Sequence, residues 1–146
     1  MTANGTTNSD KAQAAALRTS GVVTGGVALL LRVEGIAAFA AALVLYGYIG
    51  FWWPIFALCF FAPDLSMLGY LAGPRVGAAC YNFVHTYTLA GALVLAGFFA
   101  GLTMATAAGL ILIAHIGFDR ALGFGLKYAT GFGDTHFGRR NPGAIA

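Results

Sequence analysis

Four long apolar stretches separated by short turns dominate the pattern of hydrophobic and polar positions along the chain. They cover residues 22–48, 51–73 and 74–97, with a fourth from about 102 to 123 or 125. Each stretch has about the 20 residues that a helix needs to cross the hydrocarbon core of a bilayer. Helices are expected because open strand edges in lipid would leave backbone groups unpaired. The pattern predicts an all-α polytopic membrane protein, a bundle of four transmembrane helices.

The composition supports a membrane-embedded chain. Of the 146 residues, 59% are hydrophobic and 9% are charged, whereas about a quarter of the residues of a soluble domain are charged. The net charge of +3 in so uncharged a chain indicates membrane orientation rather than nucleic-acid binding. Cys59 and Cys80 lie in apolar stretches and form neither a CxxC motif nor a zinc-finger spacing. A soluble domain and a nucleic-acid-binding protein are therefore excluded.

The chain divides into three segments. Residues 1–20 are rich in small polar residues and are expected to form a mobile tail. Residues 21–125 form the transmembrane domain and residues 126–146 a C-terminal tail, which is glycine-rich and carries Asp134 and His136. Two readings of this tail stay open: a solvated segment near the head groups, or a lid that folds over the mouth of the bundle.

The distribution of basic residues predicts the orientation. With four spans, both tails and the turn at 71–76 share one side of the membrane, and this side carries seven of the eight basic residues: Lys11, Arg18, Arg75, Arg120, Lys127, Arg139 and Arg140. The turns at 49–52 and 98–102 face the other side and carry no charge. The positive-inside rule therefore places both ends of the chain in the cytoplasm. An aromatic belt is expected on the opposite side, formed by Tyr46, Tyr48, Trp52, Trp53, Phe98 and Phe99.

Five acidic or histidine residues lie within the predicted spans: Glu34, Asp64, His85, His115 and Asp119. Such residues are costly in hydrocarbon and by default indicate a functional site. A rise of about 1.5 Å per residue, counted from the cytoplasmic helix ends, places Asp64 and His85 about 15 Å deep and His115 about 12–15 Å deep. Glu34 comes out near 10 Å and Asp119 at about 6–9 Å by the same count. Four helices thus place polar groups in one layer of the cytoplasmic half.

Spacing along the helices indicates which polar groups share a face. His115 and Asp119 are four positions apart, and Asn82 and His85 are three positions apart, so each pair lies on one side of its helix. Pro63 in the second span removes a backbone hydrogen bond, so a kink is expected there. The spacing predicts that these side chains line one cavity.

Five specific strings lie along the spans and the C-terminal tail: LRVEG at 31–35, APDLSMLGYLAGPRVGA at 62–78, YNFVH at 81–85, AHIGFDRALGFGLKY at 114–128 and TGFGDTH at 130–136. They resemble the small bacterial membrane proteins grouped as domain-of-unknown-function family 4260, over about residues 28 to 138. The resemblance implies a compact multi-helix, multi-pass protein of the bacterial inner membrane. It carries no activity, but it places all five acidic or histidine residues of the spans inside the matching strings.

The residue types favour a metal site. His85, His115 and Asp119 with an open position suit zinc, and iron is a second candidate. A metal-bound water becomes nucleophilic near neutral pH, with Asp64, unless it is a fourth ligand, or Glu34 as general base. The site would then hydrolyse a lipid or another amphiphile. The residues expected around it are Asn82, Tyr70, Tyr87, Arg32, Asp134 and His136.

Three other interpretations stay open. Buried pairs of Asp64 with His85 and of His115 with Asp119 would only fix the helix register. The two histidines at similar depth could instead be the axial ligands of a b-type haem in an electron-transfer protein. The third is a non-enzymatic proton-coupled carrier or an accessory subunit of a membrane complex. Membrane lipids are the expected partners in every case, with a homo-oligomer or a membrane complex as further expectations.

Overall fold

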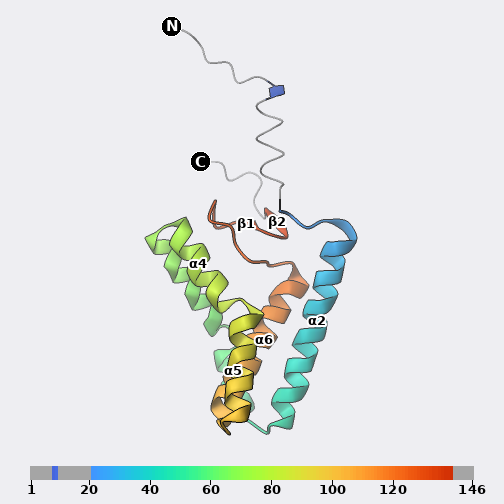
Figure 1. The fold of residues 1–146 in the computed structure, drawn as a ribbon, viewed down its shortest axis with the longest axis vertical. Helices are drawn as coiled ribbons and strands as arrows, with labels where there is room; N and C mark the ends of the chain where they lie inside the picture. Colours follow the sequence, from blue (N-terminus) through green and yellow to red (C-terminus); the bar gives the residue numbers. More distant parts are fainter. Residues whose placement is uncertain (1–7, 10–20, 140–146) are drawn as a thin grey trace.

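The fold consists of membrane-length helices with a small β hairpin at one end (Figure 1). The computed structural model describes residues 8–9 and 21–139. The elements in chain order are α2 (Gly25–Tyr48), α3 (Trp53–Cys59), the 3-10 helix η1 (Ala62–Ala72), α4 (Pro74–Val84), α5 (Tyr87–Phe99), α6 (Thr103–Leu122), β1 (Asp134–Thr135) and β2 (Gly138–Arg139). The expected N-terminal tail, residues 1–20, lies outside the described residues except for 8–9.

Four helical segments are long and apolar enough to cross a membrane: Gly25–Tyr48, Trp53–Ala72, Pro74–Phe99 and Thr103–Leu122. The prediction of an all-α bundle with four transmembrane helices is confirmed. Between the second and third segments, Gly73 has a φ of +106°, a conformation that favours glycine. Pro74 then begins α4, at a position where the missing N–H of proline breaks no helical hydrogen bond.

The second span changes helix type halfway along. Helix α3 ends at Cys59, and the chain continues as η1, which has Pro63 in its first turn. Proline cannot donate the hydrogen bond that would continue an α-helix, and short 3-10 segments accommodate such interruptions. The kink expected at Pro63 is therefore a transition from α-helix to 3-10 helix.

The third span consists of two helices, and not the single helix predicted over 74–97. Helix α4 ends at Val84, and α5 begins at Tyr87. Between them Thr86 is extended, with φ −107° and ψ 136°, and its hydroxyl accepts the N–H of Thr88 at 3.4 Å as an N-cap. A threonine cap competes with helix continuation, which explains the break. Broken helices at this depth are tolerated where protein covers the freed backbone groups.

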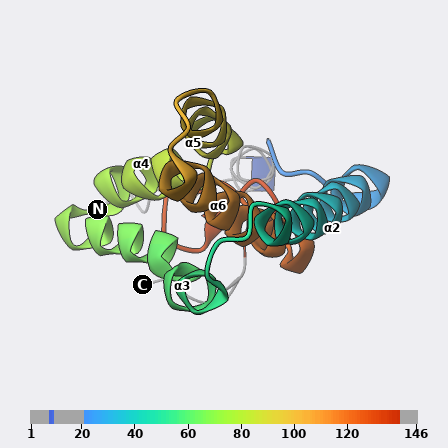
Figure 2. The same ribbon diagram turned by 90° about the horizontal axis from the view of Figure 1, so that it is seen from below.

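Helix α6 is the centre of the bundle and packs between α2 and α5 (Figure 2). Close approach to α2 requires glycines on both sides, because a Cβ at Gly35 would lie 2.8 Å from Gly117 O and one at Gly117 would lie 2.7 Å from Gly35 O. On the α5 side, a Cβ at Gly109 would lie 2.8 Å from Ala90 O. Small residues at helix crossings are the usual basis of packing in membranes.

The hairpin formed by η1 and α4 leans away from the other helices at the end of the bundle that carries β1 and β2 (Figure 1). Residues 124–139, here called the C-terminal cap, lie across this end between the hairpin and α2. Val23 N donates to His136 O at 2.8 Å, and Tyr128 Oη donates to Gly21 O at 2.7 Å. The cap thus connects the beginning of α2 with the helical hairpin.

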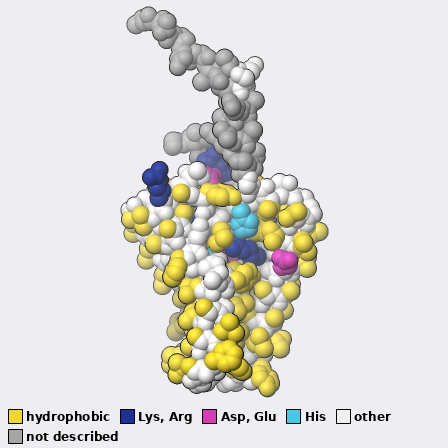
Figure 3. Space-filling model, viewed as in Figure 1, with side chains coloured by type: hydrophobic (Ala, Val, Ile, Leu, Met, Phe, Trp, Pro, Cys, Tyr) yellow, Lys and Arg dark blue, Asp and Glu magenta, His cyan; other side chains and the backbone are white. Residues whose placement is uncertain are grey.

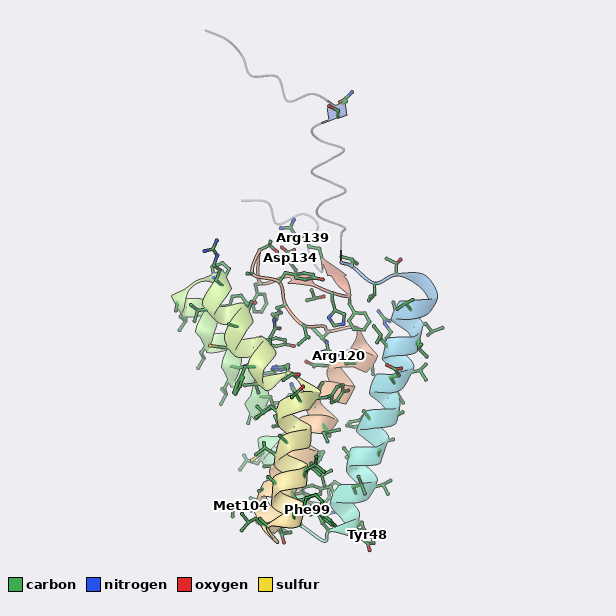
Figure 4. All side chains as sticks on the ribbon, in the orientation of Figure 1. Tyr48, Phe99, Met104, Arg120, Asp134 and Arg139 are labelled. Atoms are coloured by element: carbon green, nitrogen blue, oxygen red, sulfur yellow. The ribbon has the colours of Figure 1, made fainter. Side chains whose placement is uncertain are left out.

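Charged and apolar side chains are segregated on the surface. Figure 3 shows hydrophobic side chains over the helices, with the charged side chains nearer the end that carries the C-terminal cap. At the opposite end, Tyr48 and Phe99 are 87% and 82% exposed (Figure 4). Tyr46 differs from the expected aromatic belt because it is fully buried and donates its hydroxyl to Trp52 O at 3.0 Å. The belt therefore consists of the other aromatic residues at that end.

Candidate metal centre

Four side chains from three segments of the bundle converge on one point. Asp64, His85, His115 and Asp119 each offer one ligand atom, and the four atoms lie within 4.8 Å of one another. The Nε2 atoms of His85 and His115 are 3.1 Å apart. Asp64 Oδ1 lies 3.6 and 3.5 Å from these two nitrogens, and Asp119 Oδ2 lies 3.8 Å from each. We call these four residues the His/Asp cluster.

Five of the six separations within the His/Asp cluster are close to the edges of a small tetrahedron, and the sixth, between Asp64 and Asp119, is within 4.8 Å. Zinc is held by nitrogen and oxygen ligands at about 2.0–2.2 Å in tetrahedral geometry, which sets neighbouring ligand atoms about 3.3–3.6 Å apart. The five separations given above range from 3.1 to 3.8 Å. Two neutral imidazoles and two carboxylates also balance the charge of one divalent cation. The cluster can therefore hold a metal ion.

The helix breaks bring these four ligands together. Asp64 lies in the first turn of η1, directly after the break in the second span, and His85 is the C-cap of α4 at the break in the third. His115 and Asp119 lie one turn apart on α6, the central helix. A continuous third helix would not place His85 at a helix end. The interruptions in the second and third spans therefore help to bring Asp64 and His85 to the ligands on α6.

The four ligands differ in their access to the surroundings. The side chains of His85 and His115 are 2% and 1% exposed, that of Asp119 is 15% exposed and that of Asp64 is 33% exposed. Phe60 and Phe61 lie edge-on to the His115 ring, with ring centroids 5.5 and 6.4 Å away. The histidines thus form the closed side of the cluster and Asp64 forms its open side.

Tyr81 orients two of the four ligands. Its ring stacks on the His85 imidazole with centroids 3.6 Å apart, and its hydroxyl donates to Asp119 Oδ2 at 3.0 Å. The Nδ1 of His85 lies 2.9 Å from the backbone oxygen of Tyr81. An N–H at Nδ1 donating to this carbonyl leaves Nε2 unprotonated and directed at the cluster, an arrangement common among metal-binding histidines. Sequence reasoning missed Tyr81, although it lies four positions before His85 and so on the same helix face.

The same geometry bears on the alternative interpretations. Each histidine approaches both aspartates within 3.8 Å, so the four side chains form one group and not two separate pairs. A haem would need its iron and porphyrin ring between the two Nε2 atoms, at about 2 Å from each, and a separation of 3.1 Å leaves no room for it. The arrangement favours a single small ion shared by all four groups.

Two other residues that the sequence placed near the site lie on α2, away from the cluster. Glu34 is exposed on α2, so the residue expected as an alternative general base does not join the four ligands. Arg32 is also exposed, and its guanidinium reaches the end of α6, where a Cβ on Gly123 would lie 2.7 Å from it. Among the described residues, no ion pair joins Arg32 to Glu34.

Asn82 and Tyr70 contact the C-terminal cap. The Asn82 amide donates to Lys127 O at 2.8 Å, and its oxygen accepts the Lys127 N–H at 2.7 Å. The Tyr70 ring packs edge-on against Phe132 at 5.1 Å, and Lys127 Nζ lies 4.9 Å from the centre of the Tyr81 ring. The cap is therefore joined to the helix that carries His85 and reaches the tyrosine that orients the cluster.

Tyr87, Asp134 and His136 lie outside the His/Asp cluster. Tyr87 is 40% exposed at the start of α5. Asp134 accepts hydrogen bonds from Thr130 Oγ1 at 2.7 Å and Arg139 Nε at 3.1 Å within the cap (Figure 4). Asp134 and His136, the two residues of the C-terminal tail that were expected around the site, therefore organise the cap itself and do not reach the cluster.

Arg120 holds the backbone next to the cluster and was not predicted to do so. It lies below the cap, between α5 and α2 (Figure 4). Its guanidinium donates to Phe124 O at 3.3 Å and to His85 O at 3.5 Å. The second bond satisfies a carbonyl that the end of α4 leaves without a helical partner. In the sequence, Arg120 is only one of several basic residues on the cytoplasmic side.

Acidification is expected to loosen the cap through His136. Burial lowers the pKa of His136, and the nearby Arg120 lowers it further; the neutral Nδ1 accepts the Leu126 N–H at 2.9 Å. The pKa of His136 is lower in the closed cap than in the open cap, so opening of the cap is accompanied by proton uptake. The stabilisation of the closed cap by neutral His136 is therefore present above about pH 6.5 and is lost as the pH falls below this value. Hydrogen exchange, corrected for intrinsic rates, should show reduced protection of residues 125–139 at pH 5 relative to α2.

A His136→Gln variant provides the control for this pH dependence, since its side chain does not titrate in this range. The other ionisable groups of the cap and its contacts are Lys127, Asp134, Arg139 and Arg120. If the wild type and the variant respond equally to pH, His136 is not the responsible group.

The comparisons with known proteins add one finding. A family model described as "Domain of unknown function (DUF4260)" matches residues 28–139, which is most of the chain and includes the whole His/Asp cluster and the cap. No curated protein and no solved structure matches the chain.

Proposed function

The chain belongs to the DUF4260 family, and we propose that it is a membrane-embedded zinc protein that hydrolyses an amphiphile of the bilayer. The observation that carries this proposal is the convergence of four ligand atoms from three transmembrane segments, all within 4.8 Å of one another. The two histidine nitrogens lie 3.1 to 3.8 Å from each other and from both carboxylates. Buried ionisable groups at this depth are costly unless they are paired or bind an ion. A bound divalent ion would compensate all four groups at once.

Zinc fits the donor set better than other common divalent ions. Magnesium and calcium prefer six or more oxygen ligands, and two of the four atoms here are imidazole nitrogens. Non-haem iron is typically held by two histidines and one carboxylate, with several open positions. Zinc is usually tetrahedral, and its catalytic sites combine three protein ligands, such as two histidines and a carboxylate, with one water. Iron, the second candidate from the sequence, is therefore an outcome that metal analysis would distinguish.

The differences in exposure support distinct roles for the ligands. When bound, zinc supplies a Lewis acid and a water that is nucleophilic near neutral pH. His85, His115 and Asp119 are the better enclosed ligands and would hold the ion. Asp64, a third exposed, is the ligand that would give way to water and accept its proton. It would then return that proton to the leaving group as the ester bond of the substrate breaks.

Replacing Asp64 with asparagine is expected to separate catalysis from metal binding. Asparagine keeps the shape but cannot accept a proton, so the variant should retain zinc on the other three ligands and lose about 100-fold or more in hydrolysis. Hydrolysis of a long-chain p-nitrophenyl ester by protein in nanodiscs, with zinc content measured on the same samples, checks this. Asp134→Asn, in the cap, should behave as the wild type. Equal rates in the Asp64 variant and the wild type would refute the role of Asp64.

We also propose that both chain ends face the cytoplasm, in the bacterial inner membrane. The basic side chains of the described residues support this orientation. Lys127 and Arg139 belong to the cap and Arg75 lies in the first turn of α4, whereas the turns at 49–52 and 98–102 carry no basic residue. Reporter fusions after residues 50 and 100 should report the outside, and a fusion after residue 74 the inside. A C-terminus reported outside the cytoplasm would contradict the proposal.

A further inference from the structure

An apolar groove runs along the bundle from the far membrane side up to the His/Asp cluster. Its volume is about 430 Å³, and its walls come from α3, η1, the end of α4 and α6. Phe51 and Met104 line one end, and Met104 lies at the extremity of the bundle opposite the cap (Figure 4). No charged side chain of the described residues lines the groove. Neither the fold nor the proposed zinc chemistry assigns a role to this groove.

The other end of the groove is lined by residues that neighbour the cluster along the chain. Pro63 and Val84 line the groove and immediately precede Asp64 and His85 in the chain. On α6, Ile111 lines it one turn before His115, so both side chains lie on one face of that helix. Three of the four cluster residues therefore have a groove-lining neighbour. A molecule with its tail in the groove would place its polar end at the cluster.

We infer that the groove binds the single hydrocarbon chain of an amphiphile whose polar end is held at the His/Asp cluster, an inference that rests on the proposed function. The walls are apolar throughout, which fits a hydrocarbon and not a polar ligand. A volume of 430 Å³ lies at the small end of the about 300–1,000 Å³ range of ligand sites, which favours one chain over two. Single-chain amphiphiles, such as lysophospholipids and fatty acyl esters, are therefore the substrate class.

The position of the chain end makes this inference testable. A polar end at the cluster is already about 15 Å below the cytoplasmic surface by the helical rise, so the methyl end of a bound chain lies close to Phe51 and Met104. In an unbound lipid of either leaflet, the methyl end lies near the middle of the bilayer. A photoreactive group at the chain end thus labels different residues in the two cases.

The experiment uses the full-length protein in dioleoylphosphatidylcholine nanodiscs with a lysophosphatidylcholine that carries a diazirine at the end of its palmitoyl chain. Mass spectrometry maps the crosslinks. We expect labelling to concentrate at Phe51 and Met104, and unlabelled lysophosphatidylcholine should compete whereas the diacyl host lipid should not. Labelling spread over exposed residues elsewhere on the bundle, such as Val44 on α2, would overturn the inference.

A matched pair of variants tests the groove itself. Ala108 is an exposed alanine in the groove wall on α6, and Ala41 is an exposed alanine on α2 that does not line it. Ala108→Phe fills the groove and should reduce labelling at Phe51 and Met104 by about tenfold, the equivalent of about 1.4 kcal/mol, while Ala41→Phe should leave it unchanged. If Ala108→Phe does not fold, Ala108→Leu replaces it. Unchanged labelling in a folded Ala108 variant would overturn the inference.

Zinc content measured on the same nanodiscs separates the two proposals. Stoichiometric zinc with diffuse labelling would overturn the groove inference and leave the zinc proposal intact. Competed labelling at the groove without any bound metal would overturn the zinc proposal and support the groove as a lipid site. Zinc retained in Ala108→Phe together with reduced labelling supports both.

Discussion

Replacing His115 with alanine is expected to abolish stoichiometric zinc binding. The side chain supplies one of four ligands from the most buried position of the cluster. Loss of a residue that only hydrogen-bonds a ligand typically lowers metal affinity about 10- to 100-fold, so loss of the ligand itself should lower the affinity by more than that. The four helices should remain folded, because packing along α2, α5 and α6 does not depend on this side chain. Zinc per chain, measured by mass spectrometry on protein purified in detergent, tests the prediction.

His136→Ala is the matched control for this variant. The chain has three histidines, and His136 lies in the C-terminal cap, where it bonds Leu126 and not the cluster. It should retain zinc as the wild type does. Equal zinc content in the His115 and His136 variants would mean that the cluster does not hold the metal.

Chelation of the metal is expected to destabilise the protein by about 4 kcal/mol, if zinc is present at about 1,000 times its dissociation constant before removal. Removal of the ion would also leave two carboxylates within 3.8 Å of the histidine nitrogens, without the cation that compensates their charge. Thermal or denaturant unfolding in detergent, with and without chelator, measures the change. Added zinc should restore the original midpoint.

The double variant His115→Leu with Asp119→Leu distinguishes this effect from a purely structural pairing. Removing one member of a buried pair costs about 3–5 kcal/mol, whereas replacing both with apolar side chains can be neutral or stabilising. If the cluster were only structural, the double variant would be as stable as the wild type, and chelator would affect neither protein. We expect that the wild type responds to chelator and that the double variant does not.

The sequence was sufficient for the four membrane-length helices, because apolar length is set by bilayer thickness and reads directly from the chain. It was not sufficient for the break at Thr86. A threonine inside an apolar run is usually tolerated in a helix, and only the partner of its hydroxyl, Thr88 N, shows that it acts as a cap. Pro63 was a stronger signal of a helix interruption, because proline lacks the N–H of an α-helical hydrogen bond in any surroundings.

Depth along each helix was the most informative sequence signal for the site. It grouped Asp64, His85, His115 and Asp119, the same four residues whose ligand atoms lie within 4.8 Å in the structure. Depth does not determine the direction of a side chain around the helix axis, however. Glu34 was therefore placed in the same layer although it is exposed on α2.

The measurement that tests the central claim most directly is zinc X-ray absorption spectroscopy on the full-length protein purified in detergent. We predict close to one zinc per chain, bound by four nitrogen or oxygen ligands at about 2.0–2.1 Å, with the scattering signature of two imidazoles from His85 and His115. Absence of stoichiometric zinc, or zinc surrounded by six oxygen atoms without imidazole, would contradict the account.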